Sequence, residues 1–356
     1  MKTRKLIFGF AIAFGTQGCE RPASPTAQKL ATLSDAELRQ FVASVEDNLV
    51  FVEGGEFLMG DFGPQYASER APYDRDNDSK PLHKVEVGNY SISKFKVTNA
   101  EFQFYLRYND MKLRGKGTVF KSDWQSINSL PNTPAHLDWY EAEKYCNWLT
   151  LVTKLPFALP TEAQWEFAAR SRGQFLMVST DDGTYKSEPQ SLRTSSYSPK
   201  GINISSNGDR SEFAKKMGWN TGFLSPLPVD MFPPNPLGLY SMSDNGYEWV
   251  SDWYDPEYYK YSPLKNPQGP DNPVFKNIHG YFTKVMRGQG YANPYFGGGV
   301  NVHRTDIDPL GRFDEEGTIV LNNKTARCVV NSPEPVVSSS SIIKLGYESS
   351  KLKVPQ

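Results

Sequence analysis

Apolar residues recur along the chain with two short periods, one typical of strands and one typical of helices. Between residues 49 and 60 they alternate with polar residues on both sides of Gly54 and Gly55. Alternation interrupted by two glycines predicts two strands joined by a tight turn, that is, a β-hairpin. The same period of two returns between residues 85 and 92, which predicts further strand structure.

Helical spacing marks three segments, and each of them follows a residue that caps helices well. Thr98, Asp138 and Thr161 stand directly before apolar patterns with a period of three to four residues. Ser34 stands in the same position before a shorter apolar pattern nearer the N-terminus. We therefore predict three short capped helices among hairpins and loops, with a further short helix leading into them.

The densest run of turn formers and aromatic residues covers residues 232–254. Two consecutive prolines near its start exclude a helix, and repeated Asn and Gly supply turn positions. Its Trp and Tyr side chains can bury much surface, each with one polar group that needs a partner. The stretch predicts a core loop, with a metal-binding or ligand-binding loop as the alternative.

Composition limits the partners and the amount of regular structure. The chain of 356 residues contains 28 glycines and 26 prolines, which argue against long helices. Its formal net charge of −1 provides no attraction to nucleic acid or to anionic lipid. We expect no nucleic-acid partner.

The first residues have the features of an export signal. A basic start is followed by an apolar run, residues 6–14, that is too short for a permanent transmembrane helix. Gly18 and Cys19 then resemble the lipobox of bacterial lipoproteins. The resemblance implies a signal peptide over residues 1–18, lipidation of Cys19 and anchoring to the periplasmic face of the outer membrane through the lipid. The alternative is secretion as a soluble periplasmic protein. Residues 20–48 are expected to form a tether and the short leading helix.

Several motifs resemble, in order and approximate spacing, those of the formylglycine-generating enzyme family, also called sulfatase-modifying factor domains. The most specific are LPTEAQWEFAAR and the pair GLYSM and EWVSDWY; the others are FVEGGEFLMGD, YSISKFKVTNAEFQFY, LDWYEAEKYCNWL, VMRGQGY and ARCVV. The resemblance covers residues 49–331. It implies an α+β fold class, with a single domain related to the C-type lectin fold, little regular secondary structure and many ordered loops. Residues 332–356 lie beyond it and are expected to be a C-terminal extension that lies over the domain or is disordered, with an added strand as the alternative.

The resemblance also indicates what this chain lacks. Oxidase activity in the family depends on two cysteines that hold a copper ion, and thiolates are the soft ligands that suit Cu(I). The corresponding segment, residues 287–304, contains no cysteine. By register the two cysteine positions fall at Asn293 and Gly298, so we expect a degenerate active site and no copper.

The two other cysteines outside the export signal, Cys146 and Cys328, fit structural positions. Cys146 lies on the apolar face of a predicted helix, and Cys328 lies in a strand that closes the domain. Because free cysteine is among the most buried residue types, we expect a buried structural role for each. A disulfide between them stays open as an alternative in an oxidising compartment.

A second branch of the superfamily uses non-haem iron held by clustered histidines. The chain has four histidines, widely separated in sequence, so an iron triad would have to be assembled from distant loops. His303 and Arg304 lie in the segment where the family's active site would be. They are therefore the candidate catalytic residues, with Glu248, of an enzyme that needs no cysteine.

The resemblance further implies a structural calcium site in the segment DNGYEW, residues 244–249. This segment keeps Asn245 and Glu248, and oxygen ligands from one tight loop suit Ca²⁺. The alternative is that Glu248 accepts hydrogen bonds from the protein itself.

Two functions follow as hypotheses. We favour a non-catalytic, lipid-anchored module that binds a protein partner in the cell envelope. The resemblance implies that such a module is an accessory or toxin-immunity factor of a secretion system. The alternative is a cysteine-independent periplasmic enzyme, of siderophore-maturation or non-haem iron type, acting on a peptide-derived substrate. An enzyme would need a closed pocket with convergent polar side chains near residues 287–304.

Overall fold

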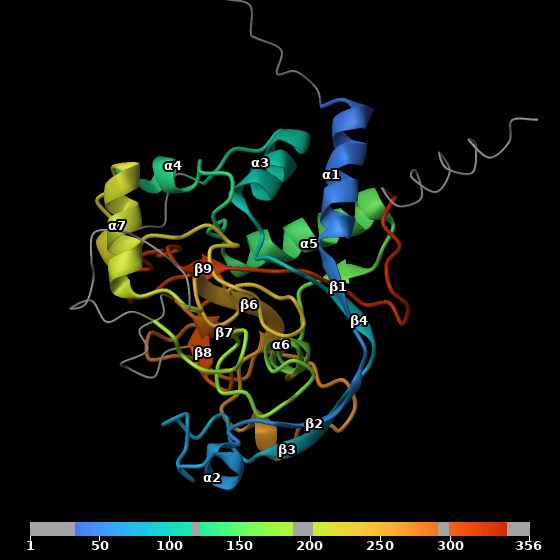
Figure 1. Ribbon diagram of the computed structural model, residues 1–356, viewed down its shortest axis with the longest axis vertical. Coiled ribbons are helices and arrows are strands. Elements are labelled where there is room, and N and C mark those ends of the chain that lie inside the picture. Colours follow the sequence, from blue (N-terminus) through green and yellow to red (C-terminus); the bar gives the residue numbers. More distant parts are fainter. Residues whose placement is uncertain (1–32, 115–121, 188–201, 291–298, 340–356) are drawn as a thin grey trace, which may run out of the picture. The chain divides into compact units, whose positions relative to one another are not determined.

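Backbone pairing in the computed structural model is divided among small sheets (Figure 1). The structure describes residues 33–114, 122–187, 202–290 and 299–339. Within them, one sheet has the strand order β1-β4-β10-β5, a second has the order β8-β7-β6-β9, and β2 pairs with β3. The strands are β1 Leu49–Val52, β2 Gly55–Met59, β3 His83–Val87, β4 Tyr90–Ser93, β5 Phe157–Ala158, β6 Gly246–Trp253, β7 Lys284–Gln289, β8 Arg304–Ile307, β9 Lys324–Thr325 and β10 Val329–Val330.

The helices are short, and the predicted caps begin them. Ser34, Thr98, Asp138 and Thr161 each accept a hydrogen bond from the backbone three residues on, and each belongs to a reciprocal capping box. The predicted helices and the α+β class are thus confirmed. The helical segments are α1 Asp35–Asp47, α2 Gly63–Tyr66, α3 Asn99–Tyr108, α4 Trp124–Ile127, α5 Trp139–Thr153, α6 Glu162–Ala169, α7 Asn207–Met217, η2 Gly222–Leu224 and η3 Tyr258–Lys260.

The cap of α6 provides a first test of these contacts. Thr161 accepts from the backbone of Gln164 at 3.1 Å, and the Gln164 side chain accepts from the backbone of Thr161 at 2.9 Å. We expect Thr161→Ala to lower the free energy of unfolding by about 1 kcal/mol, because one backbone donor loses its partner. Thr161→Ser keeps the hydroxyl and should cost much less. Urea unfolding of both variants tests this, and equal losses would contradict the assigned cap.

The predicted hairpin across Gly54 and Gly55 is wrong. β1 pairs with β4 and β2 pairs with β3, both antiparallel, so the strands on the two sides of the glycines join different sheets. A Cβ on Gly54 would lie 2.2 Å from the Val87 carbonyl oxygen. The backbone N–H of Gly54 donates to the Asn89 side chain at 2.9 Å. The glycine therefore allows a close backbone crossing from one sheet to the next.

Helix α7 lies in the region of residues 171–228, where the apolar pattern predicts no helix. Ser206 and Asp209 form its capping box. The buried positions of α7 include Asp209 and Arg210, so its inward face is largely polar. Hydrophobic periodicity cannot detect a helix whose buried face carries charged groups.

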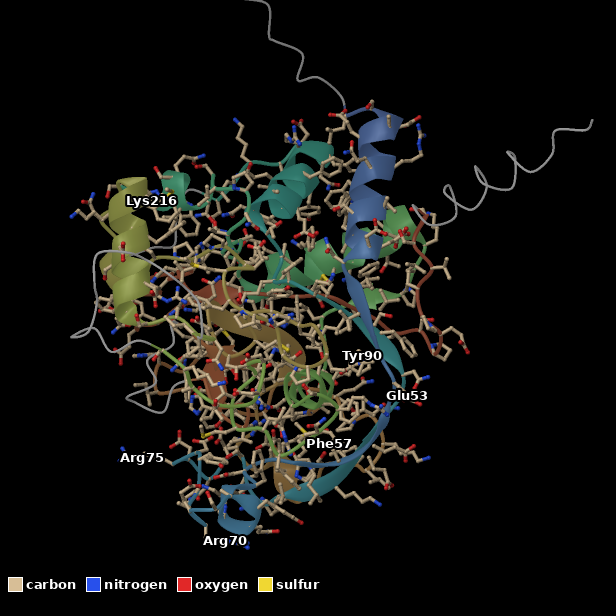
Figure 2. The ribbon with its side chains drawn as sticks, viewed as in Figure 1. Glu53, Phe57, Arg70, Arg75, Tyr90 and Lys216 are labelled. Carbon is tan, nitrogen blue, oxygen red and sulfur yellow. A yellow bond between two sulfur atoms is a disulfide. The ribbon has the colours of Figure 1, made fainter. Side chains whose placement is uncertain are left out.

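The hydrophobic core contains two large clusters among the described residues. One packs around α3 and α5, and the other packs α6 against β2, β3, β6 and β7. In the second cluster Phe57 packs against Phe167, and the buried Tyr90 donates its hydroxyl to the Gln164 carbonyl. Phe57 and Tyr90 are labelled in Figure 2. Trp249 and Met242 are completely buried. Residues 232–254 thus belong to the core, as predicted, although their second half forms strand β6.

The first part of the C-terminal extension runs beside α1. Ser339 donates from its backbone to the Glu46 carboxylate at 2.8 Å, and residues 332–338 contain no strand. The remainder of the extension, the predicted signal peptide and Cys19 lie outside the described residues. No helix within the described ranges has the length and apolar character needed to cross a membrane.

Candidate functional site

Buried charged side chains connect helix α6 to strands β7 and β8. Glu162 and Glu166 lie one helical turn apart on α6, while Arg287 and Arg304 are opposite each other in the β7–β8 register. Arg287 donates to Glu162 at 2.7 Å and to Glu166 at 2.8 Å. Arg304 donates to both oxygens of Glu162, at 2.7 and 3.0 Å, and Arg170 donates to Glu166 at 2.8 Å. We call these five residues the α6 charge cluster.

The α6 charge cluster is closed to solvent. Arg304, at 3%, is its most exposed member. Burial raises the pKa of the Glu162 carboxyl, but the charges and hydrogen bonds of Arg304 and Arg287 outweigh it, so the pKa is lowered overall. A buried ion network is stable only while every charge keeps its partner. Each carboxylate oxygen accepts from an arginine, so the cluster holds α6, β7 and β8 together and offers no carboxylate to a substrate.

The three candidate catalytic residues do not converge. Arg304 belongs to the α6 charge cluster, and its remaining Nη donates to the backbone carbonyls of Asp78 and Asp255 at 2.8 and 3.1 Å. Glu248 belongs to a separate buried network. His303 precedes Arg304, and its Nδ1 lies 3.4 Å from an oxygen of Asp74.

Glu248 lies at the centre of this second network. Its carboxylate accepts from Lys96 at 2.6 Å, from Arg327 at 2.6 and 2.7 Å, and from the Trp165 indole at 2.9 Å. Burial raises the pKa of Glu248, but Arg327 and Lys96 outweigh it and bring the pKa to about 2. Burial also lowers the pKa of Lys96 to about 8. We call these four residues the Glu248 network.

The two predicted calcium ligands are already occupied by protein groups. The Asn245 side chain accepts from the backbone of Leu227 at 2.9 Å and donates to its carbonyl at 2.8 Å. The ammonium of Lys96 donates to both the Gly246 carbonyl, at 2.8 Å, and the Glu248 carboxylate. The ammonium of Lys96 therefore occupies the oxygens that a calcium ion would need as ligands. The side chains of Asn245 and Glu248 do not fit such an ion.

The histidines are not gathered into an iron triad. His136 is buried 3.3 Å from the Asn128 side chain, and burial lowers its pKa to about 4. The ring of His83 packs against Tyr259, with 4.7 Å between the ring centres. Within the described residues, His303 is accompanied by Asp74 and Asp76 and by no second histidine. The structure therefore does not form the pair of histidines with a carboxylate that an iron triad would need.

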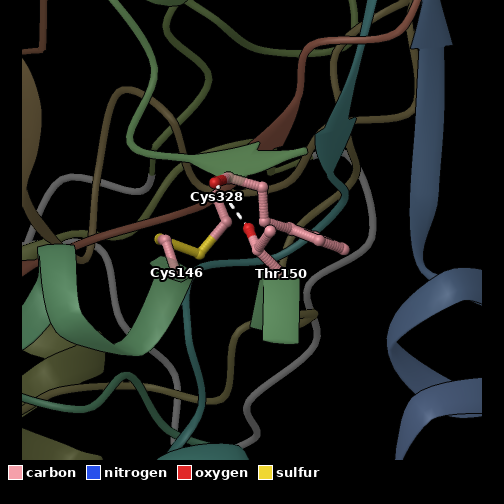
Figure 3. Close-up of a disulfide and its surroundings, with 4 residues drawn as sticks. Cys146, Thr150 and Cys328 are labelled. Atoms are coloured by element: carbon pink, nitrogen blue, oxygen red, sulfur yellow. Dashed lines mark hydrogen bonds between the residues drawn. A yellow bond between two sulfur atoms is a disulfide. The ribbon is translucent and has the colours of Figure 1, made fainter. Parts of the chain in front are cut away.

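Cys146 and Cys328 form a disulfide, the alternative that the sequence left open. It joins α5 to the residue before β10, with 5.7 Å between the Cα atoms, and both cysteines are buried (Figure 3). One helical turn after Cys146, Thr150 donates to the Phe157 carbonyl at 3.0 Å and ties α5 to β5 (Figure 3). The expected buried structural role is thus correct for both residues, although neither is a free thiol.

The degenerate positions Asn293 and Gly298 lie outside the described residues, as does Cys19. Because the chain has three cysteines and the disulfide uses two, Cys19 is the one thiol that remains. A site with two thiolates therefore cannot form within the oxidised chain.

Two groups of charged residues were missed by the sequence reasoning. Glu162 and Glu166 stand four residues apart in a mostly apolar segment, a spacing that places both on one face of a helix. Asp74, Asp76 and Asp78 alternate in the segment DRDNDS, a spacing typical of acidic cation-binding loops. Either spacing could have been found as a cluster of carboxylates.

An open groove lies on the surface between two loops. Its volume is about 380 Å³, and residues 275–279 and 306–313 form most of its walls. A neighbouring hollow of about 260 Å³ shares the Asp308–Arg312 ion pair. Ile278 is 92% exposed beside the groove, and other exposed apolar side chains nearby are Val274, Phe282 and Phe313. Apolar residues gathered in this way are typical of interaction surfaces.

Comparisons with known proteins match most of the chain. The family model described as the sulfatase-modifying factor enzyme 1-like domain matches residues 35–312. The formylglycine-generating enzyme of Streptomyces coelicolor is 28% identical over 280 residues, which cover 68% of this chain and 78% of that enzyme. The serine/threonine-protein kinase pkn1 of Chlamydia caviae is 26% identical over 254 residues, 67% of this chain, and the match spans only 33% of the kinase. The structure of PvdO from Pseudomonas aeruginosa shares the fold, with a TM-score of 0.53 and 22% identity, over 79% of this chain and 93% of PvdO.

Proposed function

The chain belongs to the sulfatase-modifying factor enzyme 1-like family, and within this family we propose that it is a non-catalytic module that binds a protein partner. The observation that carries the proposal is the α6 charge cluster. Arg287 and Arg304 flank the segment in which the family's chemistry would occur, and both are buried in ion pairs. Groups buried and paired in this way hold the elements of the fold together and are not accessible to a reacting substrate.

The cysteine content supports the same proposal. Residues 287–304 contain no cysteine, and the disulfide removes Cys146 and Cys328 as thiolates. Copper oxidase chemistry of the family's kind needs two thiolates in one site. The alternative enzyme, which would use His303, Arg304 and Glu248, is disfavoured because Arg304 and Glu248 belong to separate buried networks.

The exposed apolar residues beside the groove provide a surface for a protein partner. Ile278, Phe282 and Phe313 are large side chains in contact with solvent, and burying them against a partner would be favourable. The ion pair of Arg312 with Asp308, at 2.8 Å, lies at the edge of the groove and would supply polar contacts. This surface is thus the proposed site of partner binding.

The proposed location is the cell envelope. Acylation of Cys19 would anchor the domain to the periplasmic face of the outer membrane, and the chain between Cys19 and α1 would connect the domain to the lipid. Within that setting, an accessory or toxin-immunity factor of a secretion system is the specific role that we propose. The support for location and role is the sequence of the first residues and the resemblance to cysteine-less lipoproteins.

An activity measurement tests whether the chain lacks the family's copper oxidase chemistry. We expect the purified protein to bind no Cu(I) at the family's site and to leave the cysteine of a CxPxR peptide unchanged by mass spectrometry, because residues 287–304 lack thiolates. The Streptomyces coelicolor enzyme serves as the positive control under the same conditions. Conversion of the peptide by this chain would refute the non-catalytic proposal.

The binding surface needs its own test. We expect Ile278→Asp to abolish capture of a specific protein from envelope extracts, since a charge would be placed in the proposed apolar contact. Phe223→Ser, which changes another exposed aromatic residue outside this surface, should retain capture. Equal capture by both variants would exclude the surface around the groove as the binding site.

A further inference from the structure

Three potential metal ligands meet at the surface beside strand β8. Asp74, Asp76 and His303 each offer one ligand atom, and the three atoms lie within 4.8 Å of one another. Asp74 and Asp76 come from the loop between β2 and β3, whereas His303 directly precedes β8. These ligands are thus brought together by the fold, and not by proximity in sequence.

Asp74 carries an oxygen that the protein leaves without a donor. The residue is 4% exposed, and its Oδ1 accepts from the backbone of Asp76 at 3.1 Å. Its Oδ2 is buried and has no hydrogen-bond partner among the described residues. A buried carboxylate oxygen without a partner is costly, and such an oxygen in a native structure needs an explanation such as a bound ion.

The orientation of His303 suits a ligand. Its Nε2 lies 3.2 Å from the Thr305 hydroxyl, which leaves Nδ1 facing Asp74 at 3.4 Å. A hydrogen bond at one imidazole nitrogen is the usual way in which proteins fix the ring of a metal-binding histidine. The side chain of His303 is 34% exposed, and Asp76 is exposed, so an ion can reach both from solvent.

The surrounding charges favour a cation. Asp78 and Asp306 lie close enough to interact electrostatically with the acidic residues of the loop, and Oδ1 of Asp78 also lacks a hydrogen-bond partner within the described part of the chain. The ammonium of Lys80 donates to the backbone carbonyls of Asp74 and Asp76, at 2.9 and 2.7 Å, and leaves their carboxylates open. Arg304 donates to Glu162 and, through its other Nη, to the backbone carbonyl of Asp78, and it makes no hydrogen bond to the carboxylates of Asp74 and Asp76 among the described residues.

We propose that Asp74, Asp76 and His303 bind one divalent first-row transition-metal ion. One imidazole nitrogen and two carboxylates form a mixed donor set that suits Zn²⁺ or Mn²⁺, whereas a set for Ca²⁺ consists of oxygens alone. Solvent at the exposed side completes the coordination. None of the three ligands belongs to the α6 charge cluster or lines the groove, and the proposal does not depend on the proposed function.

Metal titration of the full chain tests the site. After treatment with EDTA, we expect the purified protein to bind one Zn²⁺ in calorimetry, and Asp76→Asn and His303→Ala each to weaken binding by roughly tenfold or more. His279→Ala is the matched control because it removes a half-exposed histidine elsewhere. Circular dichroism verifies that each variant is folded. Co²⁺ gives a second readout, since loss of the imidazole nitrogen should change its visible absorption.

Several results would overturn the proposal. One is that the wild-type protein fails to bind Zn²⁺ and Mn²⁺. Another is that Asp76→Asn and His303→Ala bind Zn²⁺ as tightly as the wild type, or that His279→Ala loses binding to the same degree as His303→Ala. A preference for Ca²⁺ that His303→Ala leaves unchanged would refute the assignment to a transition metal.

Discussion

Glu248→Gln should lower the free energy of unfolding by about 3–5 kcal/mol, because it leaves Lys96 and Arg327 buried without a negative partner. The side chains of all three residues are completely buried. Glutamine has nearly the same shape and keeps a hydrogen-bond acceptor, so the loss reports the missing charge and not a cavity. Urea unfolding monitored by tryptophan fluorescence measures the change.

A matched ion pair on the surface supplies the control for this prediction. Lys84 and Glu56 are 2.7 Å apart across β2 and β3, but their side chains are 57% and 51% exposed. Glu56→Gln should therefore cost less than about 1 kcal/mol. Equal losses in the two variants would show that burial of the Glu248 network does not matter to stability.

The pH dependence of this effect has a defined sign. The folded pKa of Glu248, about 2, lies below the ordinary value of 4.5, so the carboxylate stabilises the fold fully above about pH 4.5. This stabilisation is lost as the pH falls towards 2. The difference between the wild type and Glu248→Gln should therefore be largest near neutral pH and smaller at pH 3. A difference that grows on acidification would contradict the assigned charge state.

The double variant Cys146→Ala/Cys328→Ala should be less stable than the oxidised wild type by about 5 kcal/mol, because the two cysteines are far apart in sequence. Their separation of 182 residues means that the disulfide closes a long loop in the unfolded chain. Removing both cysteines avoids leaving one of them as an additional free thiol. Urea unfolding with and without a reductant measures the change.

The reductant also provides the control for the disulfide. It should destabilise the wild type to nearly the level of the double variant, and it should leave the double variant unchanged. If the double variant unfolds at the same urea concentration as the oxidised wild type, the disulfide does not contribute to stability.

Local structure was predictable wherever neighbouring residues determine it. Thr98, Asp138 and Thr161 identify the starts of α3, α5 and α6 because a cap needs only its own helix. Strand pairing was not predictable in the same way. The chain around Gly54 changes sheets because of its contact with Val87, and this contact is not visible in a local pattern of apolar residues.

The roles of the candidate site residues were also not predictable from the local sequence. The position of Arg304 in a family-like segment makes it a candidate catalytic residue, but its role depends on Glu162, which lies 142 residues away in the sequence. Likewise, Glu248 is explained by Lys96 and Arg327, which come from distant parts of the chain. A sequence indicates which charged residues are unusual, whereas their partners become known only from the fold.

The disulfide has a further consequence for how cleavage of this protein must be analysed. A protease cut at any one peptide bond between Cys146 and Cys328 leaves the two fragments joined through sulfur. Such a nicked chain would run as a single species on a non-reducing gel and separate into two bands only after reduction. Limited proteolysis of the oxidised protein therefore has to be read on both kinds of gel, because an apparently intact chain can already be cut.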